Sequence, residues 1–299
     1  MRGGRIAVLV IFAVAASSCA TARYAANVEY PRIGETFARN GILEECFYDC
    51  SVPGPSKRRM YVYLPADYYE TQARYPVLYL LHGARGNETS WIVKGGLLHH
   101  VDSLVTSGKM PETIVVLPNT NGYKNDRDYG KSRLKSAVES FFEVDGAVEY
   151  AFVNDVVKTV DSLYRTMPQK DSRALAGLSI GALQSIYISA ANPDCFGYIG
   201  LFSPLIRPAL NYGAYSSFFR QLKPKLNLQF SQPPELYWVM IGRKDFLFPR
   251  VNAFCNYLTR NAYPYERLTT TGGHDWPNWI SYCDKFMERL WKVGFDEYN

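Results

Sequence analysis

The chain has 299 residues, of which 47% are hydrophobic and 20% charged, and its formal net charge is +5. This length and composition are typical of a globular protein with a core of normal size, and they exclude a disordered chain. The basic residues are scattered among acidic ones, so we expect no clustered basic face and no nucleic-acid partner.

The N-terminus has the features of an export signal. Arg2 and Arg5 precede an apolar run from Ile6 to Ala16, which is too short to span a bilayer comfortably, and small residues then lead to Cys19. The sequence therefore predicts a signal peptide over residues 1–18, with lipidation at Cys19. Cleavage without lipidation, for example after "ATA" at Ala20–Ala22, is the alternative. Either way we expect an exported protein. With lipidation we expect a lipoprotein, periplasmic or on the cell surface, that meets a membrane only through this anchor.

A tether over residues 19–41 is expected to lead into one catalytic domain over residues 42–299. Besides Cys19, five cysteines remain: Cys46, Cys50, Cys195, Cys255 and Cys283. An exported protein could pair some of them. Cys46 and Cys50 lie in a segment with the pattern of a strand, where residues four apart are roughly 13 Å apart, beyond the reach of a disulfide. Either that segment bends or these two do not pair with each other.

Strand-like and helix-like runs alternate along the rest of the chain. The expected strands are Met60–Pro65, Pro76–Gly83, Thr113–Asn119, Arg173–Ser179, Tyr198–Pro204 and Glu235–Gly242, and Tyr265–His274 is expected to be a last strand and the loop that follows it. The expected helices are Glu149–Thr166, Gly181–Pro193, Pro249–Asn261 and Pro277–Phe295. This alternation predicts an α/β protein with a mostly parallel central sheet and helices on both faces. In such sheets ligands bind beyond the carboxyl ends of the strands, so we expect the chemistry in the loops there.

The segment "GLSIG" places Ser179 between Gly177 and Gly181, after an expected strand and before an expected helix. This is the context of a nucleophile elbow, a turn too tight for neighbouring side chains. A plain turn with an incidental serine is the alternative. A serine hydroxyl needs a base to become a good nucleophile.

Only four histidines can supply that base. His82 ends an expected strand and is expected to shape the loop that follows it, and His99 and His100 have no motif around them. His274 lies in "TTGGHDWPNW", downstream of Ser179 as the chain order Ser–Asp–His of this architecture requires. We therefore predict His274 as the base.

The carboxylate that orients His274 should follow the strand before it. Asp245 in "IGRKDFLF" meets this requirement, whereas Asp275 is adjacent to the histidine and cannot easily turn back onto its ring. A surface salt bridge is the alternative role for Asp245. Two backbone amides should form the oxyanion hole, those of Ile180, at the start of a helix, and Ala84, in the glycine-rich loop "GARGN".

Together these segments resemble the esterase D family of α/β-hydrolases, which includes carbohydrate-esterase feruloyl and acetyl-xylan esterases. The resemblance rests on six motifs in the family's order, over roughly residues 42–292: "RRMYVYLPADYY", "RYPVLYLLHGARGNETSW", "TIVVLPN", "RALAGLSIGA", "IGRKDFLF" and "GGHDWPNW". It implies an α/β-hydrolase fold, a triad of Ser179, Asp245 and His274, an oxyanion hole at Ala84 and Ile180, and no metal or organic cofactor. Cys195 departs from the apolar residue common in the family, and residues 121–147 match no motif.

The expected function is a serine esterase that removes feruloyl or acetyl groups from polysaccharides through an acyl-enzyme. A siderophore-ester hydrolase or an acyltransferase of the same fold is the second hypothesis. A binding protein that keeps the fold without turnover is the third. Trp91, Trp276 and Trp279 either line the substrate pocket or pack in the core, and oligomeric state stays open.

Overall fold

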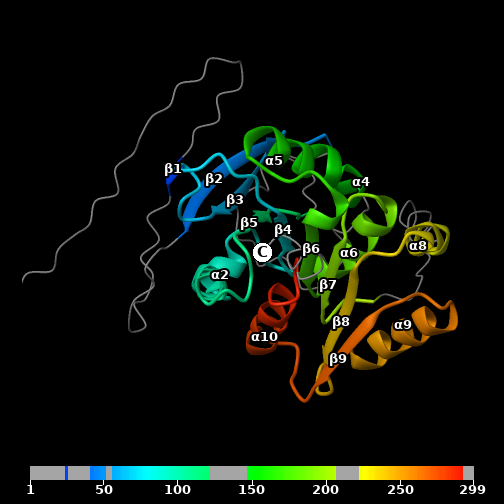
Figure 1. Ribbon diagram of the computed structural model, residues 1–299. Helices are drawn as coiled ribbons and strands as arrows, with labels where there is room; N and C mark the ends of the chain where they lie inside the picture. Colours follow the sequence, from blue (N-terminus) through cyan, green and yellow to red (C-terminus); the bar gives the residue numbers. More distant parts are fainter. Residues whose placement is uncertain (1–23, 26–40, 52–55, 122–146, 207–221, 292–299) are drawn as a thin grey trace, which may run out of the picture.

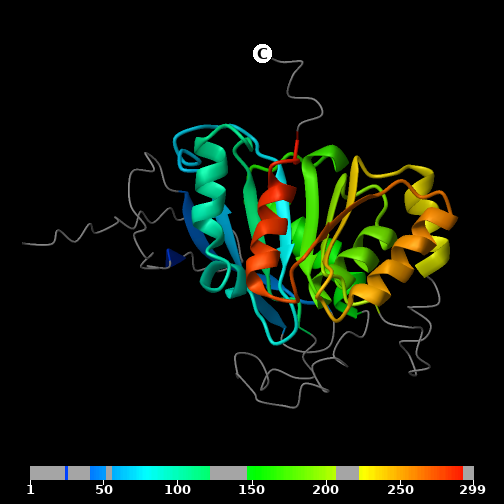
Figure 2. The same cartoon turned by 90° about the horizontal axis from the view of Figure 1, so that it is seen from below.

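The computed structural model describes residues 24–25, 41–51, 56–121, 147–206 and 222–291, which form a nine-stranded sheet with helices on both faces (Figures 1 and 2). Its spatial order is β1-β2-β3-β5-β4-β6-β7-β8-β9. In chain order the strands are β1 (Tyr24–Ala25), β2 (Ile42–Asp49), β3 (Lys57–Leu64), β4 (Val77–Leu81), β5 (Ile114–Pro118), β6 (Arg173–Leu178), β7 (Tyr198–Phe202), β8 (Leu236–Gly242) and β9 (Glu266–Thr270). The predicted α/β architecture is confirmed.

The sheet has an antiparallel edge and a parallel body. Pairs β1/β2, β2/β3 and β3/β5 are antiparallel, whereas all pairs from β5 through β4, β6, β7 and β8 to β9 are parallel. β4, β5, β6, β7 and β8 are buried at every residue, as expected for strands covered on both faces. β1 lies inside the segment that the sequence predicts to be a tether, so part of that segment joins the sheet.

The helices divide between the two faces of the sheet. One face packs against α1 (Ser90–Val93), α2 (Leu97–Thr106) and α10 (Trp276–Met287). The other packs against α4 (Ala147–Phe152), the π-helix η2 (Val153–Val157), α5 (Lys158–Leu163), α6 (Ile180–Ala191), α8 (Leu222–Ser231) and α9 (Phe248–Arg260), and a short 3-10 turn, η3 (Lys170–Ser172), precedes β6. The expected helix Glu149–Thr166 is thus divided into two α-helices, α4 and α5, which are joined through the π-helical turn η2.

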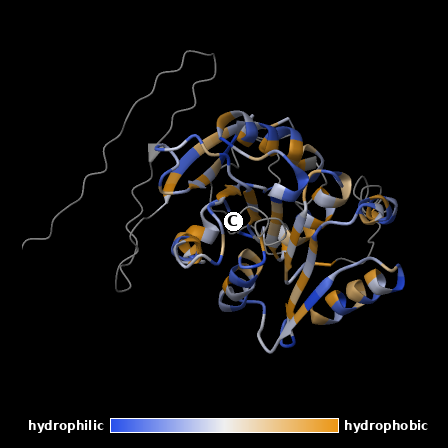
Figure 3. Ribbon diagram, in the orientation of Figure 1, coloured by the Kyte–Doolittle hydropathy of each residue, from blue (hydrophilic) through white to orange (hydrophobic). Residues whose placement is uncertain are grey.

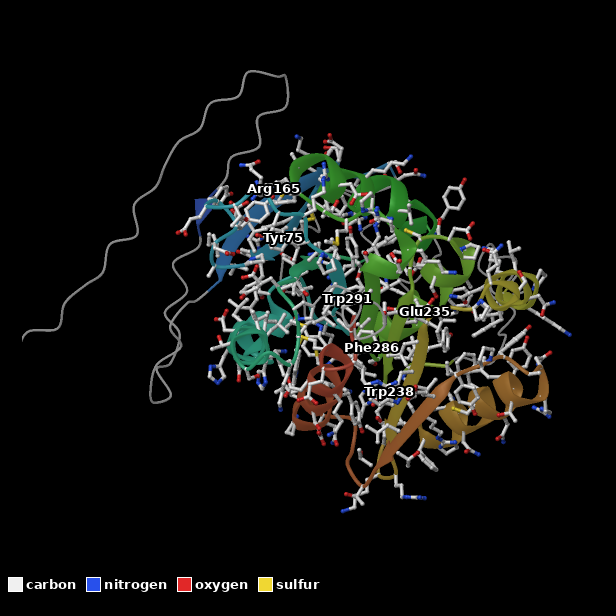
Figure 4. All side chains as sticks on the ribbon, viewed as in Figure 1. Tyr75, Arg165, Glu235, Trp238, Phe286 and Trp291 are labelled. Atoms are coloured by element: carbon white, nitrogen blue, oxygen red, sulfur yellow. The ribbon has the colours of Figure 1, made fainter. Side chains whose placement is uncertain are left out.

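Hydropathy follows this layering. The central strands are mostly hydrophobic, while α9 and α10 mix hydrophobic and hydrophilic residues, as helices with one solvated face do (Figure 3). Phe286 of α10 belongs to one core cluster with Trp238 of β8 and with Trp291 (Figure 4). The helix predicted over Pro277–Phe295 ends at Met287, yet Trp291 remains buried and packs its ring edge on Tyr198.

Some predictions fall outside the described residues: the signal peptide over 1–18, Cys19 and nearly all of the unmatched segment 121–147. Among the residues that are described, no helix is both long and apolar enough to cross a membrane. Of the five cysteines considered as candidates for pairing, Cys195, Cys255 and Cys283 are free thiols among the described residues. Cys46 lies within β2 and Cys50 directly after it, so the extended geometry that separates them is the one expected.

Candidate active site

Ser179 occupies a sharp turn between β6 and α6. Its backbone has φ 54° and ψ −110°, a left-handed conformation that a residue with a side chain rarely adopts. The turn at the end of β7 holds this backbone on both sides: Ser179 N–H donates to Phe202 O at 2.9 Å, and Leu205 N–H donates to Ser179 O at 3.0 Å. The strained residue is therefore fixed by the neighbouring strand.

The two glycines of the motif are required by close backbone contacts. A Cβ added to Gly177 would lie 2.6 Å from the carbonyl carbon of Gly181. A Cβ added to Gly181 would lie 2.4 Å from the carbonyl oxygen of His82, in the loop after β4. The predicted elbow geometry is present, and Gly181 also lets the loop that contains Ala84 approach the start of α6.

Three side chains from distant parts of the chain meet at this turn. The Nε2 atom of His274 lies 3.1 Å from Ser179 Oγ, and its Nδ1 atom lies 2.8 Å from Asp245 Oδ2. His274 follows β9, Asp245 follows β8 and Ser179 follows β6, so the carboxyl ends of three parallel strands supply them. With Nδ1–H donating to the carboxylate, Nε2 is left to accept the serine proton.

The carboxylate of Asp245 is held in its ionised form. Its side chain is fully buried, which by itself raises its pKa, but hydrogen bonds from His274 and from Leu247 N–H, at 2.8 Å, outweigh that effect and bring the pKa below the usual value. The buried hydroxyl of Ser203 also lowers this pKa, although it falls outside ordinary hydrogen-bond geometry. Asp245 is thus an anion that orients His274, not a surface salt-bridge partner.

Two aromatic rings contact the imidazole of His274. Trp279 meets it edge-on, with ring centroids 4.9 Å apart, and is buried. Phe246 meets it at 4.7 Å and is 67% exposed. Of the three tryptophans considered for the pocket, Trp91 is buried in the core and Trp276 packs against it. Trp279 belongs to the same core cluster and also contacts His274.

The loop after β4 is anchored by His82. Burial lowers the pKa of His82, and its neutral ring accepts from Thr120 N–H at Nε2, 3.2 Å away, and donates from Nδ1 to Gly83 O, 2.9 Å away. Gln184 of α6 in turn donates to Thr120 O at 3.0 Å. The prediction that His82 shapes this loop is confirmed, and the network joins the Ala84 segment to the helix that begins at Ile180.

A second network holds the far part of the same loop. The buried Glu88 carboxylate accepts from Arg59 Nε and from Asn119 Nδ2, each at 2.6 Å. Asn121 Nδ2 donates to Gly86 O at 2.8 Å. Side chains from β3 and from the end of β5 therefore fix the backbone that carries Ala84.

The other candidates lie elsewhere. Asp275 caps α10, where its side chain accepts from Asn278 N–H, so it does not hold His274. His100 pairs with Asp284 at 2.9 Å, and this carboxylate raises the pKa of His100. His99 is its neighbour on α2 and is exposed.

Sequence reasoning missed Ser203, Phe246 and Gln184. Ser203 directly follows β7 and has φ 49°, so the rule that functional residues follow the strands would have found it. Phe246 adjoins Asp245, but nothing in "KDFLF" distinguishes an exposed ring from a core ring. Gln184 lies in a helix that is buried along nearly its whole length, where a large polar side chain signals a specific partner.

Comparison with known proteins agrees with this geometry. Residues 54–285 match the family described as "Putative esterase". The chain therefore belongs to this esterase family, and the resemblance predicted from its motifs is confirmed. A solved structure also superposes on this chain. This structure, a CE1 ferulic acid esterase from Anaeromyces mucronatus, is 23% identical, with a TM-score of 0.68 over 87% of this chain and 94% of that one. The fold is the α/β-hydrolase fold.

Two curated relatives are similar in sequence. An endo-1,4-beta-xylanase/feruloyl esterase of Xylanibacter ruminicola is 31% identical over 77% of this chain, and the chain spans only 29% of that protein. An acetyl esterase of Caldicellulosiruptor saccharolyticus is 24% identical over 73% of this chain and 84% of its own length.

Proposed function

We propose that this protein is a serine hydrolase of carboxylic esters, with Ser179 as nucleophile, His274 as general base and Asp245 as the acid that orients it. The observation that carries the proposal is the continuous chain of contacts from Ser179 Oγ through both imidazole nitrogens to the buried Asp245 carboxylate. Membership of an esterase family supports it independently.

In the first half-reaction Ser179 Oγ attacks the ester carbonyl carbon while its proton passes to His274 Nε2. The resulting imidazolium is stabilised by Asp245 across the 2.8 Å contact. When the tetrahedral intermediate collapses, the carbonyl re-forms, the bond to the alcohol oxygen breaks, and His274 returns the proton to that oxygen. The products are the free alcohol and an acyl-serine.

The oxyanion of each tetrahedral intermediate needs two donors, which we assign to the backbone amides of Ala84 and Ile180. The close approach of His82 O to Gly181 and the networks around the loop after β4 support this assignment, because they hold both segments rigidly. In the second half-reaction water gives a proton to His274, attacks the acyl carbon and releases the carboxylic acid, and the proton returns to Ser179.

For the substrate we propose feruloyl or acetyl esters of polysaccharides. The support is similarity to proteins named as a feruloyl esterase and an acetyl esterase.

Export with lipidation at Cys19 is a further part of the proposal, supported by the basic and apolar residues that precede this cysteine. Mass spectrometry of the wild type and Cys19→Ser from membrane fractions would test it, since only the wild type should carry diacylglycerol.

The decisive experiment compares hydrolysis of para-nitrophenyl acetate by the wild type and Ser179→Ala. We expect the rate to fall by about 10⁴-fold or more, because the acyl-enzyme can no longer form. A fluorophosphonate probe should label Ser179 in the wild type and leave the variant unlabelled. Equal rates would exclude the proposed mechanism. Release of ferulate against acetate from arabinoxylan would then identify the acyl group.

A further inference from the structure

Phe246 is an exposed aromatic ring at the reactive end of the site. It is 67% exposed although its ring centroid lies 4.7 Å from that of His274. Single exposed apolar side chains are ordinary on protein surfaces. This one is distinguished by its contact with the residue that handles the proton.

The backbone around Phe246 is fixed. On one side Asp245 N–H donates to Gly242 O at 3.1 Å, and on the other Leu247 N–H donates to the Asp245 side chain at 2.8 Å. Leu247 is buried and begins the turn into α9. Phe246 therefore projects from a rigid turn between two buried residues, and its exposure does not come from a loose loop.

The chemistry of the triad determines which part of a substrate Phe246 can meet. His274 Nε2 must deliver its proton to the oxygen of the departing alcohol, so that oxygen lies within hydrogen-bond distance of the imidazole, about 3 Å. The acyl group, in contrast, is bonded to Ser179 and has its oxygen toward the amides of Ala84 and Ile180. A ring that contacts the imidazole from the solvent side is consequently next to the alcohol half of the ester.

We infer that Phe246 is a specificity-determining residue that binds the sugar ring carrying the ester, in the leaving-group position. This inference rests on the proposed function, in which the alcohol is a sugar of a polysaccharide. A phenyl ring offers a flat apolar surface without hydrogen-bonding atoms, which suits the C–H face of a sugar and leaves the sugar hydroxyls free for water. The ring acts on substrate binding, so its removal should raise KM more than it lowers kcat.

The test uses two esters with the same acyl group and different alcohols. Methyl ferulate and a feruloylated arabinoxylan oligosaccharide form one pair, and ethyl acetate and an acetylated xylo-oligosaccharide form the other. We expect Phe246→Ala to lower kcat/KM for the sugar ester about 10-fold more than for the alkyl ester of the same pair, mainly through KM. Phe246→Trp, which retains a flat ring, should keep most of the sugar preference.

Leu228→Ala provides a matched control, because Leu228 is also an exposed large apolar residue, at 60%, but lies on α8. Leu228→Ala should leave kcat/KM unchanged for both the sugar ester and the alkyl ester. Equal losses on both esters in Phe246→Ala would mean that the ring only supports His274 and would overturn the inference, as would no loss on either. A wild type that hydrolyses alkyl esters but neither sugar ester would instead reject the proposed substrate class.

Discussion

Strand β6 carries a buried polar network at each end, and the two networks have opposite uses. Arg173 opens the strand and pairs with Asp161 of α5, while Ser179 follows its last residue and contacts His274. Both ends therefore bring a carboxylate to a nitrogen base through a short contact. The difference between them lies in what the base can do with a proton.

The Arg173–Asp161 pair cannot take part in proton transfer. A guanidinium does not give up its proton in proteins, so the pair can only hold α5 against the sheet. Asp161 also accepts from Thr166 Oγ1 at 2.7 Å. Burial raises the pKa of the nearby Cys195 thiol to about 11 and raises that of Tyr79 well above its usual value, so neither is an available nucleophile at neutral pH. The residue that departs from the family pattern, Cys195, is structural.

The Ser179 end uses the same ingredients with an exchangeable proton. Imidazole titrates near neutrality, has one donor and one acceptor nitrogen, and here each nitrogen faces a different partner. The serine is held in a left-handed conformation, which costs about 1–3 kcal/mol and persists because the turn after β7 fixes it. A carboxylate paired with a nitrogen base can support catalysis when that base can accept and then release a proton and a hydroxyl lies in contact with it.

Removing the charge at the reactive end should give the largest effect. We expect Asp245→Asn to lower kcat for para-nitrophenyl acetate by about 10³–10⁴-fold, because His274 loses the anion that fixes its tautomer and stabilises its charged form. Asp275→Asn is the matched control: it removes a neighbouring exposed carboxylate, and asparagine caps a helix equally well. It should retain kcat within about twofold. Comparable losses in both variants would contradict the assignment of Asp245.

The same change at the other end should affect stability instead. Asp161→Asn leaves the largely buried Arg173 guanidinium without its counter-charge. Because Asp161 is partly exposed, the loss should fall between that of an exposed and that of a buried pair, so we expect the free energy of unfolding to fall by about 2 kcal/mol. The value of kcat should stay within about threefold. Urea denaturation and steady-state kinetics measure the two quantities, and Asp171→Asn, an exposed carboxylate in η3, should change neither. If kcat of Asp161→Asn falls by much more than threefold while the variant stays folded, the Arg173 end also contributes to activity, and the distinction between the two ends fails.

Much of this site follows from the sequence because few residues can fill its roles. Fully apolar runs such as Val77–Leu81 identify the buried strands, four histidines leave little choice of base, and Gly177 and Gly181 mark the elbow. Since the carboxyl ends of parallel strands share one edge, the meeting of Ser179, Asp245 and His274 is predictable without coordinates.

The supporting residues are not predictable in this way. The antiparallel pairing of β1 with β2 and of β2 with β3 depends on contacts between segments. The π-helical turn at Val153–Val157 interrupts a pattern that reads as one helix. Ser203 and Phe246 act through their place beside Asp245 and His274. The position of Ser203 after a strand marks it as a candidate but does not reveal its role, and nothing in the sequence around Phe246 distinguishes it from a packing residue.

The smallest predicted effect is the contribution of His82, near the reactive end, to the pH dependence of stability. Its ring is buried and neutral, and burial lowers its pKa. The unfolded chain therefore binds a proton that the folded chain does not as pH falls below about 6.5, the ordinary histidine value. The stability contributed by neutral His82 is complete above that pH and is lost toward the lowered pKa, at up to about 1.4 kcal/mol per pH unit.

Urea unfolding of the wild type, His82→Gln and His99→Gln between pH 7.5 and 5 would measure this contribution. We expect the loss of stability with falling pH to be shallower in His82→Gln than in the wild type, and unchanged in His99→Gln, because His99 is exposed on α2. Protonation of His82 at Nε2 would also abolish the hydrogen bond from Thr120 N–H, so the loop after β4, which contains Ala84, should become more mobile at acid pH. An equal slope in His82→Gln and in the wild type would mean that His82 does not make stability depend on pH and would contradict this prediction.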